Sequence, residues 1–218
     1  MGASFWYCGA MRIVLASGNA HKRRELGEIF AGHALFVPAD LGLDFHHEET
    51  GATFLSNAVG KALTLFRLLG EGKGFGVISD DSGISLPALD GAPGVYSARY
   101  GELDGAFTGA GPFTDEMRNA LLVRRMRGAR DRRAFFVCAM VFLVSEFRFF
   151  TAQETWEGVL AQGPSGAGGF GYDPLLFLPE WGCTVAELPS HEKNRVSHRA
   201  KAARALRVFM ENSGEGGE

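Results

Sequence analysis

Two acidic clusters are the residues of this sequence best suited to metal-assisted chemistry. They are Glu48-Glu49-Thr50-Gly51 and Asp80-Asp81-Ser82-Gly83, and the second directly follows a short apolar run. Magnesium takes oxygen ligands and usually combines one or two carboxylates with substrate phosphates. Open α/β sheets bind ligands at the carboxyl ends of their strands. The second cluster is therefore expected at a strand end beside a divalent cation, and two separate solvated turns are the alternative interpretation.

The two adjacent aspartates of the second cluster are expected to differ in role. Successive residues of a strand point to opposite faces of the sheet. Asp80 and Asp81 can therefore serve the same site only if the chain has already turned where they stand.

A turn at residues 17–22 is a candidate phosphate-binding element. It lies between an apolar run at residues 11–16 and a helical pattern that follows. The free N–H groups and the positive dipole end of a helix N-terminus bind anions, and Lys22 would add a charge within the first turn. The alternative is a helix N-cap at Asn19 with a surface lysine.

A second lysine, Lys61, lies one helical turn after Asn57 at the edge of an apolar stripe. Its side chain can reach into a cleft or stay on the surface.

Two segments of the C-terminal half could form a nucleotide-base pocket. The turn Phe170-Gly171-Tyr172-Asp173 offers rings for stacking and a carboxylate to accept hydrogen bonds, although a glycine-rich turn with two core aromatics is the alternative. Ser197-His198-Arg199 places positive charge at an expected helix start, where the dipole disfavours it by ~0.3–1 kcal/mol. Sites that break a local rule in this way are often functional.

Other motifs carry less weight. The glycines at 166, 168 and 171 match G-x-G-x-x-G, but no helix is expected after them, so a dinucleotide fingerprint is not indicated. A basic cluster could bind nucleic acid, but it has few interleaved aromatic residues, and a solvated face is the favoured interpretation. Its members are Arg118, Arg124, Arg125, Arg127, Arg130, Arg132 and Arg133.

Periodicity predicts the elements that must position these residues. Strands are expected at residues 11–16 and 75–79, and two antiparallel strands at 134–144 and 147–159. Helices are expected after residue 19, over 52–70, after Thr114 and after Ser197, the last with Ala203, Leu206, Val208 and Met210 inside or at its edge. The alternation predicts an α/β fold with a mixed sheet.

Composition limits the remaining possibilities. The chain has 218 residues, 46% of them hydrophobic, and a net charge of -3, which excludes disorder and gives no global field for nucleic acid or anionic membranes. The longest apolar run, at residues 134–144, is too short to span a bilayer. Three scattered cysteines without C-x-x-C spacing indicate a reducing, cytoplasmic setting and no structural zinc. Residues 1–10 are interpreted as an extension and residues 211–218 as a mobile tail.

Taken in order, five blocks of this sequence resemble the inosine triphosphate pyrophosphatase family from residue 11 to about residue 209. They are SGNAHKRREL (17–26), EETGATFLSNAVGKA (48–62), SDDSGISLPALDGAPGVYSARYG (79–101), GGFGYDPLLFLP (168–179) and TVAELPSHEKNRVSHRAKA (184–202). The resemblance implies one domain over residues 11–210 with an elongated, two-lobed α/β fold, a substrate cleft between the lobes, Mg²⁺ dependence and a homodimer. It also implies hydrolysis of ITP, dITP and XTP to the monophosphate and pyrophosphate, which cleanses the nucleotide pool.

The resemblance assigns roles residue by residue. Asp81 matches the catalytic proton acceptor and, with Glu48, the metal ligands. The residues that match substrate-binding positions are Ser17, Gly18, Asn19, Ala20, His21, Lys22, Lys61, Ser82, Phe170, Gly171, Tyr172, Asp173, Lys193, His198 and Arg199. His198 and Arg199 are expected to donate hydrogen bonds to the 6-oxo group of the base.

Departures from the family pattern are mild, and two rival functions stay open. Ser17 stands where Thr is also common, Ser56 stands where Glu is frequent, and residues 1–10 match nothing. One rival is a pyrophosphatase for other modified-base nucleotides, which would share the phosphate machinery but differ in the base pocket. The other is a non-catalytic module that binds nucleotides or nucleic acid through the basic cluster.

Overall fold

The computed structural model describes residues 6–7, 10–70, 74–102, 105 and 113–212. The end of the predicted tail, at residues 213–218, and most of the predicted N-terminal extension lie outside these ranges, and so does Cys8. The chain divides into two compact units. The first consists of Met1–Asp81, Cys138–Glu154 and His198–Glu218, and the second of Ser82–Val137 and Thr155–Ser197.

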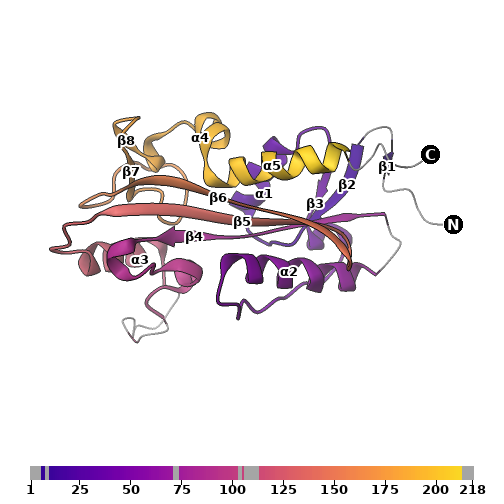
Figure 1. Ribbon diagram of the computed structural model, residues 1–218, viewed down its shortest axis with the longest axis horizontal. Coiled ribbons are helices and arrows are strands. Elements are labelled where there is room, and N and C mark those ends of the chain that lie inside the picture. The colour runs from indigo at the N-terminus through magenta and orange to yellow at the C-terminus, as the bar shows by residue number, and fades with distance from the viewer. Residues whose placement is uncertain (1–5, 8–9, 71–73, 103–104, 106–112, 213–218) are drawn as a thin grey trace. The chain divides into compact units, whose positions relative to one another are not determined.

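Helices and strands alternate along the described chain (Figure 1). The helices are α1 (Ala20–Ile29), α2 (Phe54–Leu69), α3 (Asp115–Arg125), α4 (Ser190–Val196) and α5 (His198–Asn212). The strands are β1 (Trp6–Tyr7), β2 (Ala10–Leu15), β3 (Ala34–Phe36), β4 (Gly76–Ser85), β5 (Arg133–Ser145), β6 (Arg148–Leu160), β7 (Leu176–Leu178) and β8 (Cys183–Thr184). The predicted helices and strands are therefore present in the predicted order, and β1, β3, α4, β7 and β8 are elements that the sequence analysis did not identify.

Within the described residues, eight strands form one sheet in the order β1-β2-β4-β5-β6-β7-β8, with β3 also paired to β2. β2 pairs in parallel with β3 and β4 and antiparallel with β1. β7 pairs antiparallel with both β6 and β8. The predicted α/β fold with a mixed sheet is thus confirmed, and β4, β5 and β6 each contribute residues to both units.

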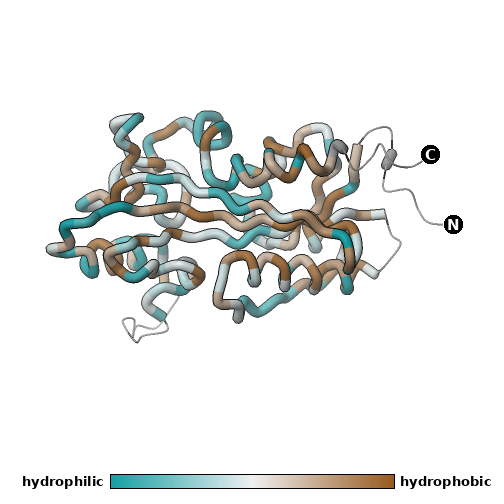
Figure 2. Tube along the Cα trace, viewed as in Figure 1, coloured by the Kyte–Doolittle hydropathy of each residue, from teal (hydrophilic) through white to brown (hydrophobic). Residues whose placement is uncertain are grey.

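The predicted pair of strands over residues 134–144 and 147–159 is confirmed in β5 and β6. Only Glu146 and Phe147 separate these neighbouring strands, and a two-residue connection joins antiparallel strands. Nearly all residues from Ala134 to Leu143 are buried, and Figure 2 shows the hydrophobic colour along most of β5. A strand buried on both faces requires such a continuous apolar run.

In the first unit, helices cover both faces of the strands. Ile13 and Ile78 pack with residues of α1 and α5 in one cluster, whereas Val14 and Val77 pack with residues of α2 in another. Figure 1 shows α1 and α5 on one side of these strands and α2 on the other. The two-residue period of the strands thus assigns each side chain to one helical layer.

The helix starts follow the predicted capping residues. The side chain of Asn19 accepts from the N–H groups of His21 and Lys22 at the start of α1, and the side chain of Thr114 accepts from Met117 in α3. Thr53 caps α2 in the same way. These bonds satisfy N–H groups that a helix cannot pair internally.

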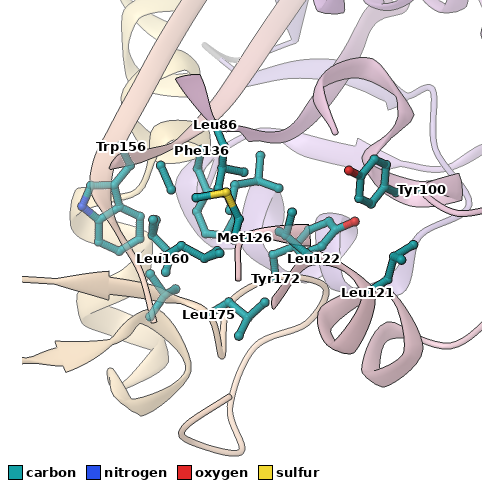
Figure 3. Packing of buried hydrophobic residues seen from close by; sticks show 14 of the residues in the cluster. Leu86, Tyr100, Leu121, Leu122, Met126, Phe136, Trp156, Leu160, Tyr172 and Leu175 are labelled. Atoms are coloured by element: carbon teal, nitrogen blue, oxygen red, sulfur yellow. The ribbon is translucent and has the colours of Figure 1, made fainter. Parts of the chain in front are cut away.

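In the second unit, α3 packs on strand and loop residues. Leu121 and Leu122 of α3 lie in one buried cluster with Phe136 of β5, Trp156 of β6 and Tyr172 (Figure 3). α3 is therefore anchored by its apolar face.

Two details differ from the predictions. β4 does not end at Ser79 but continues through Asp80, Asp81 and Ser82 to Ser85, so the second acidic cluster is part of a strand and not a turn. In α5, Ala203, Leu206 and Met210 are buried as predicted, but Val208 is 56% exposed because it lies off the apolar stripe. No helix among the described residues is long and apolar enough to cross a membrane.

Candidate functional site

Asp80 and Asp81 point to opposite faces of β4 and have different partners. Asp80 is fully buried and contacts Lys22 of α1 and Arg199 of α5. Asp81 accepts a hydrogen bond from the Asn57 side chain of α2, with a nitrogen-to-oxygen distance of 2.9 Å. The strand geometry thus places the two carboxylates on opposite sides of β4, and the predicted difference in their roles stays a prediction.

The side of β4 that faces α1 and α5 carries a buried chain of charges. Lys22 Nζ lies 3.0 Å from Asp80 Oδ2, and Arg199 Nε lies 3.2 Å from the same oxygen. Arg199 Nη1 also donates to Glu25 Oε2 at 2.6 Å. All four residues come from the first unit, and Glu25, Asp80 and Arg199 are nearly inaccessible to solvent. The network therefore alternates carboxylates and cations in a low-dielectric environment, where such pairing is required.

This pairing controls the protonation of Asp80. Burial alone would raise the pKa of its carboxyl group, but the charges of Lys22 and Arg199 outweigh burial and hold the pKa well below its usual range. The pKa of Arg199, which burial would lower, is raised by the charges of Asp80 and Glu25. Asp80 is therefore a permanent anion that offers no proton transfer.

Asp81 lies in the opposite electrostatic situation. Burial raises the pKa of its carboxyl group, the hydrogen bond from Asn57 lowers it, and the charge of Glu49 raises it further, so that the net shift is upward. A raised pKa makes a carboxylate a stronger base near neutral pH. Of the two adjacent aspartates, Asp81 is the one suited to accept a proton.

Helix α2 ties the first acidic cluster to Asp81. Asn57 Oδ1 accepts from the N–H of Gly51 at 2.7 Å while its Nδ2 binds Asp81. One turn later, Lys61 forms a short ion pair with Glu49. Burial would lower the pKa of Lys61, but the charges of Asp80 and Glu49 raise it, so this lysine stays charged. α2 thus brings a cation and a second carboxylate to the side of β4 that carries Asp81.

In the first cluster, the structure places the two neighbouring glutamates differently. Sequence reasoning chose Glu48 as a metal ligand, but Glu48 is exposed, and its neighbour Glu49 makes the contact with Lys61. The metal role of Glu48 stays a prediction, while Glu49 is the carboxylate whose charge acts on Asp81.

The predicted phosphate-binding turn begins α1 as expected, but several of its N–H groups are already engaged. The Ser17 hydroxyl accepts from the N–H of Asn19 at 3.1 Å. The Asn19 side chain accepts from His21 at 2.8 Å and from Lys22 at 3.2 Å. Ser17 and Asn19 thus shape the turn, while Gly18, Ala20 and His21 are exposed, and the helix dipole and Lys22 remain its means of attracting an anion.

In the second unit, the predicted base-pocket residues form a separate group. Lys193 of α4 lies 2.7 Å from Asp173 Oδ2, and its Nζ is 4.7 Å from the centre of the Phe170 ring. Asp173 Oδ2 also accepts from the N–H of Phe170 at 2.9 Å. A cation, an aromatic ring and a carboxylate are thus placed together, as a base-binding site needs.

Tyr172 does not offer a stacking ring. Its ring is only 5% exposed within the core of the second unit, and its hydroxyl donates to the carbonyl of Ser97 at 2.9 Å (Figure 3). Residues 171–175 form a turn in which Tyr172 is buried, while Phe170, just before it, is partly exposed. For this ring, the alternative interpretation of a core aromatic holds.

The remaining predicted residues are placed as follows. His198 is buried at the first position of α5, and Arg199 follows it in the ion network of the first unit; the predicted contact of both with the base stays a prediction. Ser82 is partly buried and directly follows Asp81 in β4. The charge that breaks the helix-dipole rule at Arg199 is thus compensated by Asp80 and Glu25.

Three residues of this arrangement were missing from the predicted site. They are Glu25, Glu49 and Asn57. Glu25 could have been identified from the sequence, because it is a charged residue beside Leu26 on the buried side of α1 and a buried charge needs a partner. Asn57 could have been identified from its spacing to Lys61, which places both residues on one helix face.

Magnesium is compatible with this donor set, although the described residues contain no group of three or more His, Cys, Asp or Glu side chains that could hold a metal ion. Magnesium binds through one or two carboxylates when phosphates supply further oxygens. Asp81 and Glu49 are two carboxylates close enough for their charges to interact. The first unit therefore fits a hard divalent cation that arrives with a phosphate ligand.

Part of the basic cluster is used within the second unit. Arg132 donates to the carbonyls of Leu160 and Ala161, and Arg133 pairs with Asp131 at an exposed position. Arg118 pairs with Asp115 on α3. These three arginines therefore have intramolecular partners, which agrees with the favoured interpretation of a solvated face.

Comparison with known proteins identifies the family. A curated relative from Treponema denticola named dITP/XTP pyrophosphatase is 43% identical over 203 residues, covering 93% of this chain and all of the relative. Another from Thermus thermophilus with the same name is 44% identical over 200 residues, covering 90% of each chain. The solved structure of the Staphylococcus aureus Ham1 protein matches with a TM-score of 0.79 at 35% identity, covering 93% of this chain and 99% of that one. The sequence profile of the Ham1 family matches residues 13–209, and the chain belongs to this family.

Proposed function

We propose that the protein hydrolyses deaminated purine nucleoside triphosphates, namely ITP, dITP and XTP, to the monophosphate and pyrophosphate in the presence of Mg²⁺. The names of its relatives support this substrate class. The observation that carries the proposal is the division of roles between adjacent aspartates. Asp80 is a permanent anion within a cationic network, and Asp81 has a raised pKa and a fixed orientation.

Asp81 accepts the proton in the proposed reaction. A water molecule oriented by its carboxylate attacks the α-phosphorus, the proton passes to Asp81, and the bond from the α-phosphorus to the bridging oxygen breaks so that pyrophosphate leaves. The upward pKa shift favours this transfer. The hydrogen bond from Asn57 to Oδ2 fixes the rotation of the carboxyl group, which orients the proton acceptor.

Cations of the first unit stabilise the phosphate charge. Lys61 and Lys22 are held in place by Glu49 and Asp80 and attract the triphosphate, with the N-terminus of α1 as an additional positive end. Asp81 would hold Mg²⁺ together with a carboxylate of the first acidic cluster, either the predicted Glu48 or its neighbour Glu49, and the ion when bound neutralises charge on the phosphate oxygens. Because these ion pairs exist before substrate arrives, little reorganisation is required.

Base recognition is proposed for the loop at residues 170–173 with Lys193. Phe170 offers a partly exposed ring, and the neighbouring Lys193 ammonium can donate to the 6-oxo group of a purine. Adenine carries an amino group at that position, so a donor would face a donor and a polar group would be buried unpaired, at ~1–3 kcal/mol. His198 is retained as a further donor to the base.

We also propose that the protein acts as a homodimer on the cytoplasmic nucleotide pool. Its relatives suggest the nucleotide substrate, and the dimer follows from the family resemblance. Multi-angle light scattering of the purified protein measures the mass directly. A mass of twice 23.5 kDa is expected, and the monomer mass would contradict the dimer.

The experiment that tests the activity is a product assay. The protein is incubated with Mg²⁺ and, separately, ITP, XTP, GTP and ATP, and pyrophosphate and orthophosphate are measured in each reaction. Pyrophosphate from ITP and XTP with little from ATP is the expected result. Orthophosphate instead would show that another bond is cleaved. No product from any of the four would favour a modified-base substrate or binding without catalysis.

A further inference from the structure

Helix α3 holds the loop at residues 170–173 through two side chains that no motif predicted. Asp115 Oδ2 accepts from the backbone N–H of Gly171 at 2.7 Å. Asn119 Nδ2 donates to the carbonyl of the same residue at 3.0 Å. Asp115 and Asn119 are four residues apart, so both project from one face of the helix. Together they fix the two peptide planes on either side of Gly171.

The helix that makes these contacts is firmly anchored in the second unit. Its first turn is capped by Thr114, and Leu121 and Leu122 pack in the core beside Tyr172 (Figure 3). Asp115 also pairs with Arg118, which stabilises the orientation of its carboxylate. The position of Gly171 is therefore set by a rigid element rather than by the loop alone.

Stability does not explain the amide group of Asn119. The residue is 5% exposed, and its Oδ1 has no hydrogen-bond partner in the part of the chain that the structure describes. A buried acceptor without a partner costs free energy, and an apolar side chain of the same size would avoid that cost. The amide is thus present for its donor, which binds the Gly171 carbonyl.

We propose that Asp115 and Asn119 are positioning residues that determine base specificity. By fixing the two peptide planes of Gly171, they set the direction of Phe170, which precedes those planes, and of the chain that follows them through Tyr172 to Asp173. This inference rests on the proposed function, in which the loop reads the base. Because Asp81 and the lysines that serve the phosphates belong to the first unit, loss of this positioning raises KM and weakens base discrimination while kcat is kept.

The substitution Asn119→Leu separates positioning from stability. It keeps the number and branching of the side-chain heavy atoms, removes the donor to Gly171 and removes the unpaired Oδ1. We expect the Tm to stay unchanged or to rise, because an unpaired buried acceptor is removed. The KM for ITP should rise roughly tenfold, and the preference for ITP over ATP, measured as the ratio of their kcat/KM values, should fall roughly tenfold. The kcat should stay within about twofold of that of the unsubstituted protein. Amide hydrogen exchange of residues 170–172 should quicken, while exchange in α2 should not change.

Two further variants act as controls. Asp115→Asn keeps an acceptor for the Gly171 N–H and should retain most of the ITP preference, whereas Asp115→Ala should lose it. Glu116→Gln removes an acidic charge from the same helical turn at an exposed side chain whose hydrogen bond is to Thr114, and it should leave both KM and exchange unchanged.

The outcomes separate this inference from the proposed function. An Asn119→Leu variant with normal KM and normal ITP preference, compared with an unsubstituted protein that prefers ITP, would overturn the positioning role alone. A lower Tm together with a proportional loss of kcat would also overturn it, since that pattern indicates a structural role. An unsubstituted protein without preference for ITP over ATP would overturn the proposed function and this inference with it.

Discussion

The two units hold their candidate site residues by different physical means. In the first unit, buried ion pairs fix Lys22 through Asp80 and Lys61 through Glu49. In the second unit, the loop at residues 170–173 is held mainly by hydrogen bonds to its backbone, together with one buried ion pair. Charges placed in advance suit a triphosphate, whereas a loop of defined shape suits a planar base. The difference predicts which substitutions affect turnover, stability or substrate preference.

The largest effect is expected from Asp81→Asn. The substitution keeps the size of the side chain but removes the proton acceptor, so turnover of ITP should fall by about 10²–10⁴-fold. The Tm should not fall, because burial disfavours the charge that the substitution removes. Pyrophosphate release at saturating ITP measures the effect. The matched control is Asp90→Asn, an exposed aspartate with φ of 51°, a conformation that asparagine also adopts.

A near-normal kcat in the Asp81→Asn variant would remove Asp81 from its proposed role. A large drop in Tm would instead point to a structural function for this carboxylate. The Asp90→Asn control identifies any effect that arises from replacing a carboxylate as such.

The second largest effect is expected from Asp80→Asn, and it concerns the free energy of unfolding. Asp80→Asn leaves Arg199 and Lys22 without their shared anion, and breaking a buried pair typically costs about 3–5 kcal/mol. Urea unfolding should show this loss. Asp131→Asn, which breaks the exposed pair with Arg133, should have a much smaller effect because water screens that pair. Equal losses in the two variants would show that the buried network does not have the proposed importance.

The same variant predicts a pH dependence. The pKa of Asp80 in the folded protein lies well below its unfolded value of about 3.9, so its stabilisation is fully present above that value. It is lost as the pH falls from there toward the folded pKa. The difference in unfolding free energy between the unsubstituted protein and Asp80→Asn should therefore be constant near neutrality and shrink below about pH 4. A difference that stays constant down to pH 3 would contradict the network.

Local signals predicted most of the fold, and tertiary contacts decided the rest. The cap at Asn19 and the apolar runs along β2 and β5 depend on neighbours in sequence, and these predictions are confirmed. The continuation of β4 through Asp80 and Asp81 was not predictable in this way. A buried charge is costly unless it is paired, and these two aspartates are tolerated within a strand because partners come from α1, α2 and α5.

Prediction of the candidate site from sequence is limited in the same way, because tertiary contacts decide which side chains are buried. A motif identifies residue types but not which neighbour faces inward, so it did not show that Glu49 contacts Lys61 while Glu48 is exposed. The Tyr172 ring was expected to meet a ligand because its neighbours form a motif, yet it fills the core. Arg199 carries positive charge in a substrate-binding block, but its charge serves Asp80 and Glu25.

The smallest effect sharpens the comparison from the side of the second unit. Gly169 has φ of 73°, and a Cβ there would lie 1.9 Å from Asp173 Oδ2, the oxygen that binds Lys193 and the N–H of Phe170. Gly169→Ala should therefore raise the KM for ITP several-fold with kcat kept. Gly182→Ala is the matched control, because φ is 65° but a Cβ meets nothing within 4 Å. Both variants carry backbone strain of roughly 1 kcal/mol, so only displacement of Asp173 separates them. Steady-state kinetics with ITP and ATP measure the difference between the two variants. A KM that is raised only in Gly169→Ala supports recognition of the base by the shape of this loop. Equal KM values in the two variants would show that Asp173 does not contribute to binding.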